Sequence, residues 1–499
     1  MPQLYCVIPF VFNNQSFNDA ELCRLWKKEF AYFNLLVTAF LHPKCPARIV
    51  TTESLQAVDP RNPILTPVCS LAHKDRNGNR VSRGVDVQPA SLLPLNCASV
   101  TGPKRAPAII ENGSCLERKL TASEKRFRIL HVVAARPNMM KVAPILAEMG
   151  KRPEVEPLLV HTGQHYDYSM SQVFFQQLHL PPADYNLEVG GGNHHFQTGE
   201  VIKKFGELVQ TVRPDCIVVV GDVNATMACS LVAAKECVSL VHVEAGLRSN
   251  DRTMPEEVNR IVADSLADLL LVTERSGEEN LKREGIPASR IVFTGNVMID
   301  SLCQILDEAR HSTILNRLGV QLRTYVLVTL HRPSNVDDPT QLKATMDALA
   351  KIAIQIPVVF PVHPRTSKRM LDLGITLSQV SGDMKVGARG IYALEPAPYI
   401  DFIALMDSAS LVLTDSGGVQ EETTYLGVPC LTYRMSTERP VTAEVGTNRL
   451  IGADPATLES EVAKSLRDGR PGEHRIPPMW DGHAAPRIVD AILGFLRKR

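Results

Sequence analysis

The stretch DCIVVVGDVNATMACSLVAAKECVSLVHVEAG, residues 215–246, decides the fold of this chain. It holds two short runs of Val, Ile and Leu, each closely followed by an acidic residue, and between them lies a segment rich in Ala. This pattern predicts a buried strand, a helix and a second buried strand. Strands that are apolar at nearly every position are typical of a parallel sheet covered by helices on both faces.

The same alternation of strands and helices extends from this stretch in both directions. It begins at Arg126, and it restarts after Ile299. Two such runs predict an α/β fold of two doubly wound, Rossmann-like domains, residues 126–298 and 299–482, with a cleft between them. A last helix, residues 483–499, is expected to pack back on the first domain.

Residues 1–125 have a different, irregular texture with many prolines. Within them, the segment HKDRNGNRVSRG, residues 73–84, is interpreted as a loop. No fold or role is assigned to this N-terminal extension.

The composition argues against several classes of function. The 499 residues carry 54 basic and 54 acidic side chains, so no overall field favours nucleic acid or an anionic membrane. The longest apolar runs are far shorter than the ~20 residues that span a bilayer, and the sequence predicts no signal peptide. The 11 cysteines include no C-x-x-C pair, which favours unpaired thiols in a reducing compartment. We therefore expect a cytoplasmic protein.

The segment LTDSGGVQEE, residues 413–422, combines an anion site with carboxylates. Ser416 can cap a helix that begins with Gly417 and Gly418, and the exposed amides of such a helix start suit a diphosphate. Glu422 lies further along the helix and can accept two hydrogen bonds from a ribose diol. The segment predicts a nucleoside diphosphate site, and an ordinary strand-to-helix turn is the alternative.

Cationic or proton-donating residues follow other predicted strands. Arg136 and Lys141 lie at one strand-to-helix junction, and His331 and Arg439 lie beyond two later strands. Each alone is more often structural, but together they supply what a pyrophosphate leaving group requires. The chain contains neither G-x-G-x-x-G nor a P-loop motif, which argues against a dinucleotide fingerprint and against P-loop chemistry.

Acidic residues complete the candidate chemistry. Asp222 and Glu244 directly follow buried strands, where a charge is unexpected unless it has a function. Glu256 follows Pro255 at a predicted helix start and can instead pair with Arg260 four residues on. A structural role is therefore an equal alternative for Glu256.

Nine motifs in one continuous region, residues 126–499, carry a resemblance to the non-hydrolysing UDP-N-acetylglucosamine 2-epimerases. They are RPNMMK, TGQH, GDVNAT, HVEAGLRS, PEEVNR, TGNVMID, VTLHR, TDSGGVQEE and TERP, in the order found in that family. The resemblance implies the two-domain arrangement of GT-B glycosyltransferases and a homodimer. It also implies conversion of UDP-N-acetylglucosamine to UDP-N-acetylmannosamine through a 2-acetamidoglucal, without NAD or metal.

The resemblance also implies roles for individual residues. Asp222, Glu244 and Glu256 resemble the family's catalytic acids and bases, and His331 resembles its catalytic histidine, assigned to the diphosphate leaving group. The positions that match UDP-binding residues are Arg136, Lys141, Phe402, Ser416, Gly417, Gly418, Glu422 and Arg439. Gln164, Arg332 and His363 match parts of a site where some bacterial members bind a second substrate molecule as activator.

The chain departs from the family pattern near these motifs, at Ala135, Asn138, Val223, Pro333 and Ser334. These changes leave activation by substrate and the sugar specificity open. Alternatives are a 2-epimerase of a modified sugar, such as a UDP-linked 2,3-diacetamido uronic acid, a GT-B glycosyltransferase, a hydrolysing epimerase, and an inactive sensor of nucleotide sugars.

Overall fold

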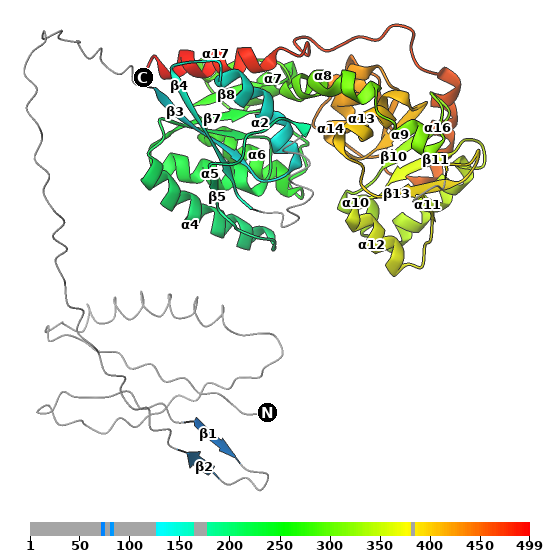
Figure 1. The fold of residues 1–499 in the computed structure, drawn as a ribbon, viewed down its shortest axis with the longest axis horizontal. Coiled ribbons are helices and arrows are strands. Elements are labelled where there is room, and N and C mark those ends of the chain that lie inside the picture. Colours follow the sequence, from blue (N-terminus) through cyan, green and yellow to red (C-terminus); the bar gives the residue numbers. More distant parts are fainter. Residues whose placement is uncertain (1–70, 75–79, 84–125, 164–176, 381–384) are drawn as a thin grey trace, which may run out of the picture. The chain divides into compact units, whose positions relative to one another are not determined.

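The structure, a computed structural model, describes residues 71–74, 80–83, 126–163, 177–380 and 385–499 (Figure 1). The chain divides into two units, Met1–Leu116 and Glu117–Arg499. In the first unit, strands β1 (Leu71–Lys74) and β2 (Arg80–Arg83) pair antiparallel. The loop predicted for residues 73–84 is therefore wrong at both of its ends. The Asn77-Gly78 dipeptide between the strands is a hairpin signal that this interpretation overlooked.

The first half of the second unit contains a parallel sheet of seven strands, in the order β5-β4-β3-β6-β7-β8-β9. The strands are β3 (Phe127–Val133), β4 (Val155–His161), β5 (Tyr185–Asn186), β6 (Cys216–Val220), β7 (Ser239–Val243), β8 (Leu269–Val272) and β9 (Ile291–Phe293). The helices are α2 (Arg136–Met149), α4 (His194–Val212), α5 (Asn224–Lys235), α6 (Pro255–Leu266), α7 (Arg275–Arg283), the 3-10 turn η1 (Ala288–Arg290) and α8 (Val297–Arg310).

The second half contains another parallel sheet of seven strands, in the order β12-β13-β11-β10-β14-β15-β16. The strands are β10 (Val326–Thr329), β11 (Val358–Pro361), β12 (Ser378–Gln379), β13 (Ile391–Leu394), β14 (Leu411–Thr414), β15 (Cys430–Thr432) and β16 (Asn448–Leu450). The helices are α9 (Ile314–Leu318), α10 (Pro333–Val336), α11 (Pro339–Ile352), α12 (Pro364–Asp372), α13 (Tyr399–Ser408), α14 (Gly417–Leu426), α15 (Val441–Glu444), α16 (Pro455–Asp468) and α17 (Ala484–Leu496).

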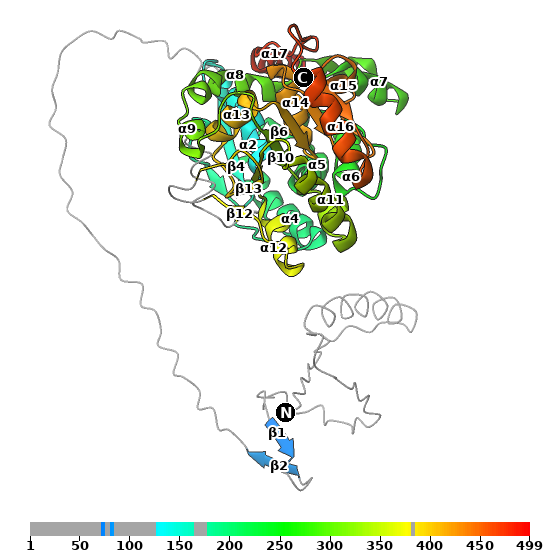
Figure 2. The ribbon, with the colours of Figure 1, turned by 90° about the vertical axis from the view of Figure 1, so that its right-hand side faces the viewer.

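Helices cover both faces of each sheet. Consecutive side chains of a strand point to opposite faces, so each strand contributes to two hydrophobic cores. On β3, Ile129 faces a core that includes α2, while Leu130 faces another that includes α4 and α5. In the second sheet one face packs against α11 and α16, which lie side by side (Figure 2). These features confirm the predicted α/β fold of two Rossmann-like halves.

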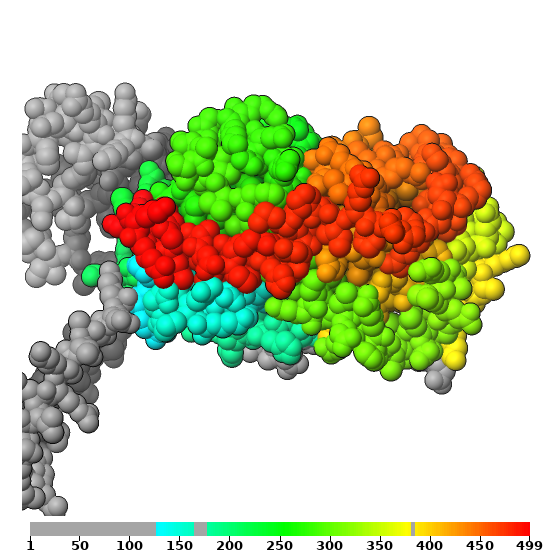
Figure 3. All heavy atoms as spheres, turned by 90° about the horizontal axis from the view of Figure 1, so that it is seen from above, coloured from blue at the N-terminus to red at the C-terminus, as the bar shows by residue number. Residues whose placement is uncertain are grey.

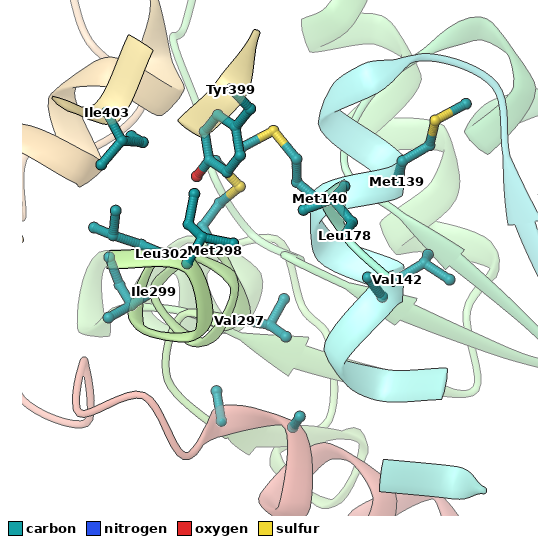
Figure 4. Packing of buried hydrophobic residues seen from close by; sticks show 14 of the residues in the cluster. Met139, Met140, Val142, Leu178, Val297, Met298, Ile299, Leu302, Tyr399 and Ile403 are labelled. Carbon is teal, nitrogen blue, oxygen red and sulfur yellow. The ribbon is translucent and has the colours of Figure 1, made fainter. Parts of the chain in front are cut away.

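One hydrophobic cluster runs through both halves of the second unit. Met140 of α2, Met298 of α8 and Tyr399 of α13 are all buried in it and lie close together in Figure 4. Helix α17 packs against both α2 and α8, and the segment leading to it runs along one face of both halves (Figure 3). The two sheets therefore share part of their core.

Candidate active site

Several of the predicted site residues lie where the strand order of each sheet reverses. In the first sheet this point is between β3 and β6, and in the second it is between β10 and β14. Lys141 lies on the helix after β3, Asp222 follows β6, His331 follows β10, and Ser416 follows β14. Ligands of open α/β sheets bind at such points, beyond the carboxyl ends of the strands.

Glu244 joins the two halves through ion pairs. Its Oε1 accepts a hydrogen bond of 2.6 Å from Arg439 Nη2, and its Oε2 pairs with Lys141 Nζ. All three side chains are buried. Glu244 also has a φ of +69°, a region that costs a residue other than glycine about 1–2 kcal/mol. The structure thus brings one predicted acid and two predicted UDP-binding cations into direct contact.

Asp222 lies in the same charged network and accepts a 2.5 Å hydrogen bond from Arg260 Nη1. Arg260 also pairs with Glu257 at 2.7 Å, rather than with Glu256 as the i,i+4 spacing suggested. Burial opposes ionisation of Asp222, but the charges of Arg260, Lys141 and Arg439 outweigh it and lower its pKa. Asp222 is therefore an anion at neutral pH, as a general base must be.

Several members of this network were missed by sequence reasoning. Glu438 accepts two hydrogen bonds from Arg434, at 2.9 and 2.7 Å, and its Oε2 lies 3.6 Å from Arg439 Nη1. Glu421 accepts a 2.6 Å bond from Arg439 Nε. Glu274, which follows β8, is buried, and burial raises its pKa to about 7. The sequence signals of these residues are weak: Glu274 lies just past an apolar strand, Glu421 lies one turn into a helix, and Glu438 lies in the segment between β15 and α15.

His331 is held by Asp415, another residue that was not predicted. Asp415 is fully buried and lies 2.9 Å from His331 Nδ1, and it also accepts hydrogen bonds from the backbone N–H groups of His331 and Arg332. Burial opposes its ionisation, but these donors outweigh it and lower its pKa. His331 remains partly exposed, so its ring is oriented from behind by a carboxylate and is accessible in front.

Two of the three candidate activator residues, Arg332 and His363, lie beside His331. The ring of His363 is 5.6 Å from that of His331, and burial, helped by His331 and Arg136, lowers the pKa of His363. Arg332 Nη1 lies 3.4 Å from Glu256 Oε1, a second ion pair between the two halves. Gln164 lies outside the described residues.

Helix α14 begins at the predicted residues, but the predicted side-chain cap is not formed. Gly417 and Gly418 are its first residues, and Ser416 is the N-cap residue, yet the Ser416 side chain makes no capping hydrogen bond. The N–H of Ser416 instead donates to Thr414 Oγ1 at 3.0 Å. The expectation that the Ser416 hydroxyl caps the helix is therefore wrong.

Glu422 is buried on the same helix and accepts a 2.7 Å hydrogen bond from the Tyr399 hydroxyl. Burial raises its pKa to about 8. Phe402, on α13 with Tyr399, is partly buried against the shared hydrophobic cluster. A cavity of about 430 Å³ lies elsewhere, beside β15, β16 and α16, and none of the predicted residues line it. We therefore base the candidate site on the charged network and not on that cavity.

Gly417→Ala should weaken UDP binding by displacing Arg439. A methyl group at this position would overlap Arg439 Nη1 and lie 2.9 Å from its Cζ. Such overpacking costs about 1–3 kcal/mol, so we expect the affinity for UDP, measured by calorimetry, to fall roughly tenfold or more. The matched control is Gly206→Ala on α4, where a methyl group meets no atom within 4 Å. Equal UDP affinities in the two variants would contradict the role of Gly417.

Glu422→Gln should flatten the pH dependence of stability. A carboxyl group whose pKa is raised on folding contributes its full stability below the unfolded pKa, and this contribution is lost as the pH rises toward about 8. We expect the free energy of unfolding of the unmodified chain to fall between about pH 5 and about pH 9 by a few kcal/mol more than that of the variant. Urea titrations measure both values, and parallel pH profiles would contradict the burial of a titrating Glu422.

No helix in the part that the structure describes is long and apolar enough to cross a membrane. In the same part, no group of three or more His, Cys, Asp or Glu side chains is placed to hold a metal ion.

Comparison with known proteins gives a consistent result. A family model described as UDP-N-acetylglucosamine 2-epimerase matches residues 147–493. The chain is 37% identical over 365 residues to the UDP-N-acetylglucosamine 2-epimerase of Methanocaldococcus jannaschii, covering 72% of this chain and 96% of that protein. It is 39% identical over 368 residues to the UDP-2,3-diacetamido-2,3-dideoxy-D-glucuronate 2-epimerase of Pseudomonas aeruginosa, covering 73% and 99%.

Among solved structures, the chain is similar to the Methanocaldococcus jannaschii UDP-GlcNAc 2-epimerase in complex with UDP-GlcNAc and UDP. The TM-score is 0.67 at 35% sequence identity, and the match covers 74% of this chain and all of that one. The residues that the family model matches, 147–493, include Asp222, Glu244 and Arg439 of the charged network.

Proposed function

The chain belongs to the UDP-N-acetylglucosamine 2-epimerase family, and we propose that it inverts carbon-2 of UDP-N-acetylglucosamine to give UDP-N-acetylmannosamine. The relatives identify it as an epimerase, an isomerase of nucleotide sugars. The observation that carries the proposal is the placement of Asp222 and Glu244 directly after adjacent strands, among cations from both halves. That is the arrangement needed for proton transfer beside a departing diphosphate.

The proposed reaction has two steps. A carboxylate removes the proton from carbon-2 while the bond from carbon-1 to the diphosphate oxygen breaks, and UDP leaves with the bonding electron pair. The product is a 2-acetamidoglucal. UDP then adds back to carbon-1 as carbon-2 is protonated on the opposite face, so atoms and charge balance. Asp222, Glu244 and Glu256 are proposed to surround the pyranose, and His331 to stabilise the leaving oxygen.

The ion pairs of Glu244 suggest how substrate binding activates it. Lys141 and Arg439, the two cations proposed to bind the diphosphate, are both paired with Glu244. A diphosphate that takes over these cations loosens their hold on Glu244, which then becomes available for proton transfer. The amides of Gly417 and Gly418 at the start of α14 complete the proposed diphosphate site, with Glu422 at the ribose.

A second candidate substrate is favoured by one finding. The Pseudomonas aeruginosa relative that is 39% identical acts, by its name, on a UDP-linked diacetamido glucuronate. The same elimination and re-addition apply to that sugar, so the two candidates differ only in the groups around the pyranose. We further propose a cytoplasmic homodimer in which residues 126–298 and 299–482 form the two domains and the N-terminal extension is dispensable.

Solvent exchange tests the proposed function directly. In heavy water we expect deuterium to enter carbon-2 of UDP-N-acetylglucosamine and the manno epimer to form, both observed by proton NMR. Faster exchange with the diacetamido uronate would favour the second substrate. An intact UDP-sugar that binds without exchange would instead identify a sensor and overturn the proposal.

A further inference from the structure

His242, next to the last residue of the buried strand β7, lies between the two turns that carry Asp222 and Glu244. Its side chain is fully buried. Its Nε2 lies 2.8 Å from the carbonyl oxygen of Gly221, and its Nδ1 lies 2.6 Å from Asp264 Oδ1. Gly221 directly precedes Asp222, and Glu244 follows His242 by two residues. One imidazole therefore contacts the backbone of the first turn and belongs to the strand that leads into the second.

The partners of this imidazole determine its protonation. A carbonyl oxygen can only accept a hydrogen bond, so Nε2 must carry a proton. Asp264 Oδ2 accepts from the N–H of Gly246 and pairs with Arg248 Nη1 at 2.7 Å, as a carboxylate does. Burial opposes ionisation of Asp264, but His242 and Arg248 outweigh it and lower its pKa. An ionised Asp264 accepts from Nδ1, so both ring nitrogens donate.

The same pair holds the turn that follows β7. The N–H groups of Glu244 and Ala245 both donate to the carbonyl of Leu271, and the next N–H, that of Gly246, donates to Asp264. Glu244 keeps its left-handed backbone within this set of bonds. Asp264 thus contacts the Glu244 turn directly and the Asp222 turn through His242.

We infer that His242 and Asp264 form a buried imidazolium–carboxylate pair that positions the two catalytic carboxylates of the proposed reaction. His242 and Asp264 are positioning residues in this inference, because the atoms they contact belong to the turns and not to the substrate. The expected effect on kcat rests on the proposed function, whereas the protonation of both His242 ring nitrogens rests on the hydrogen-bond geometry alone.

The substitution Asp264→Asn removes the negative charge of the carboxylate but keeps nearly the same side-chain shape. The amide oxygen of Asn can still accept from Gly246 and Arg248, while its NH₂ group donates to Nδ1 of a neutral ring whose Nε2 still donates to Gly221. We expect nitrogen-15 spectra of histidine-labelled protein to show two protonated ring nitrogens for His242 in the unmodified chain and one in the variant. His242→Gln assigns the resonance by removing it.

The kinetic expectation for Asp264→Asn is a kcat lower by about 10- to 100-fold with little change in KM. The kcat is calculated from the concentration of UDP-binding sites, so that misfolded protein does not lower it. The matched control is Asp268→Asn, at the opposite end of β7, where the carboxylate accepts from the N–H of Leu240. We expect that variant to keep its kcat.

Two results would overturn the inference. A His242 ring with only one protonated nitrogen in the unmodified chain refutes the charged pair, and this measurement needs neither a variant nor an active enzyme. A folded Asp264→Asn protein with unchanged kcat refutes the positioning role. Failure of the proposed function is a different outcome, because it shows as an absence of carbon-2 exchange in the unmodified chain.

Discussion

Glu244→Gln is expected to lower epimerisation and carbon-2 exchange by about 10³-fold or more, within the range that a general acid–base residue contributes. Glutamine has nearly the same shape but cannot take up a proton. The buried cations around Glu244, Lys141 and Arg439, would lose an anionic partner that competes with the diphosphate. Affinity for UDP should therefore be retained or increased, so the loss should be confined to kcat.

Proton NMR in heavy water measures the exchange in this variant, and calorimetry measures UDP binding. The matched control is Glu278→Gln, at a partly exposed glutamate that pairs with Lys282 one turn along α7, and this variant should exchange at the unmodified rate. Near-normal exchange in Glu244→Gln would refute the role proposed for Glu244. A loss of UDP affinity as large as the loss of rate would instead make it a binding residue.

Arg439→Ala should be the most destabilising change at the site and should also abolish tight UDP binding. The guanidinium is buried and pairs with Glu421 and Glu244 at 2.6 Å and with Glu438 at 3.6 Å. Removing it leaves the buried Glu421 carboxylate without the cation that it pairs with, which typically costs about 3–5 kcal/mol. The same change removes a cation proposed to hold the diphosphate.

Urea unfolding and calorimetry with UDP measure the two effects of Arg439→Ala. Arg449→Ala is the control, because Arg449 lies nearer the surface and pairs with Glu461 at 3.0 Å. We expect it to cost less than about 1 kcal/mol and to leave UDP affinity unchanged. Similar stability losses in the two variants would show that the buried network is not held together by Arg439.

The features that could be predicted from the sequence are those that local patterns determine. Apolar strands such as residues 216–220 and 239–243 and the helices between them are readable one segment at a time. Because parallel strands end at one edge of a sheet, their polar ends could also be placed together. The bonds of Arg439 to Glu244 could not be predicted in this way, since they join residues 195 positions apart.

Other parts of the site depend on burial, which local patterns do not reveal. Asp415 was given no role from the sequence, yet it is fully buried and orients His331. Ser416 had the right residue type for a cap, but its hydroxyl makes no such bond, and its backbone N–H donates to Thr414 Oγ1. The residue type alone does not show which role Asp415 or Ser416 takes, because the tertiary packing decides it.

The packing of α17 has a consequence for synthesis of the chain. Ile488, Ile492 and Leu496 fill the core face of the first half that also holds α2 and α8. These side chains leave the ribosome only after the whole second half. During synthesis, the hydrophobic surface of the first half that α17 covers therefore stays exposed until the end of the chain is made. We expect chaperones to bind the nascent chain during this interval, and we expect truncated products that lack α17 to aggregate.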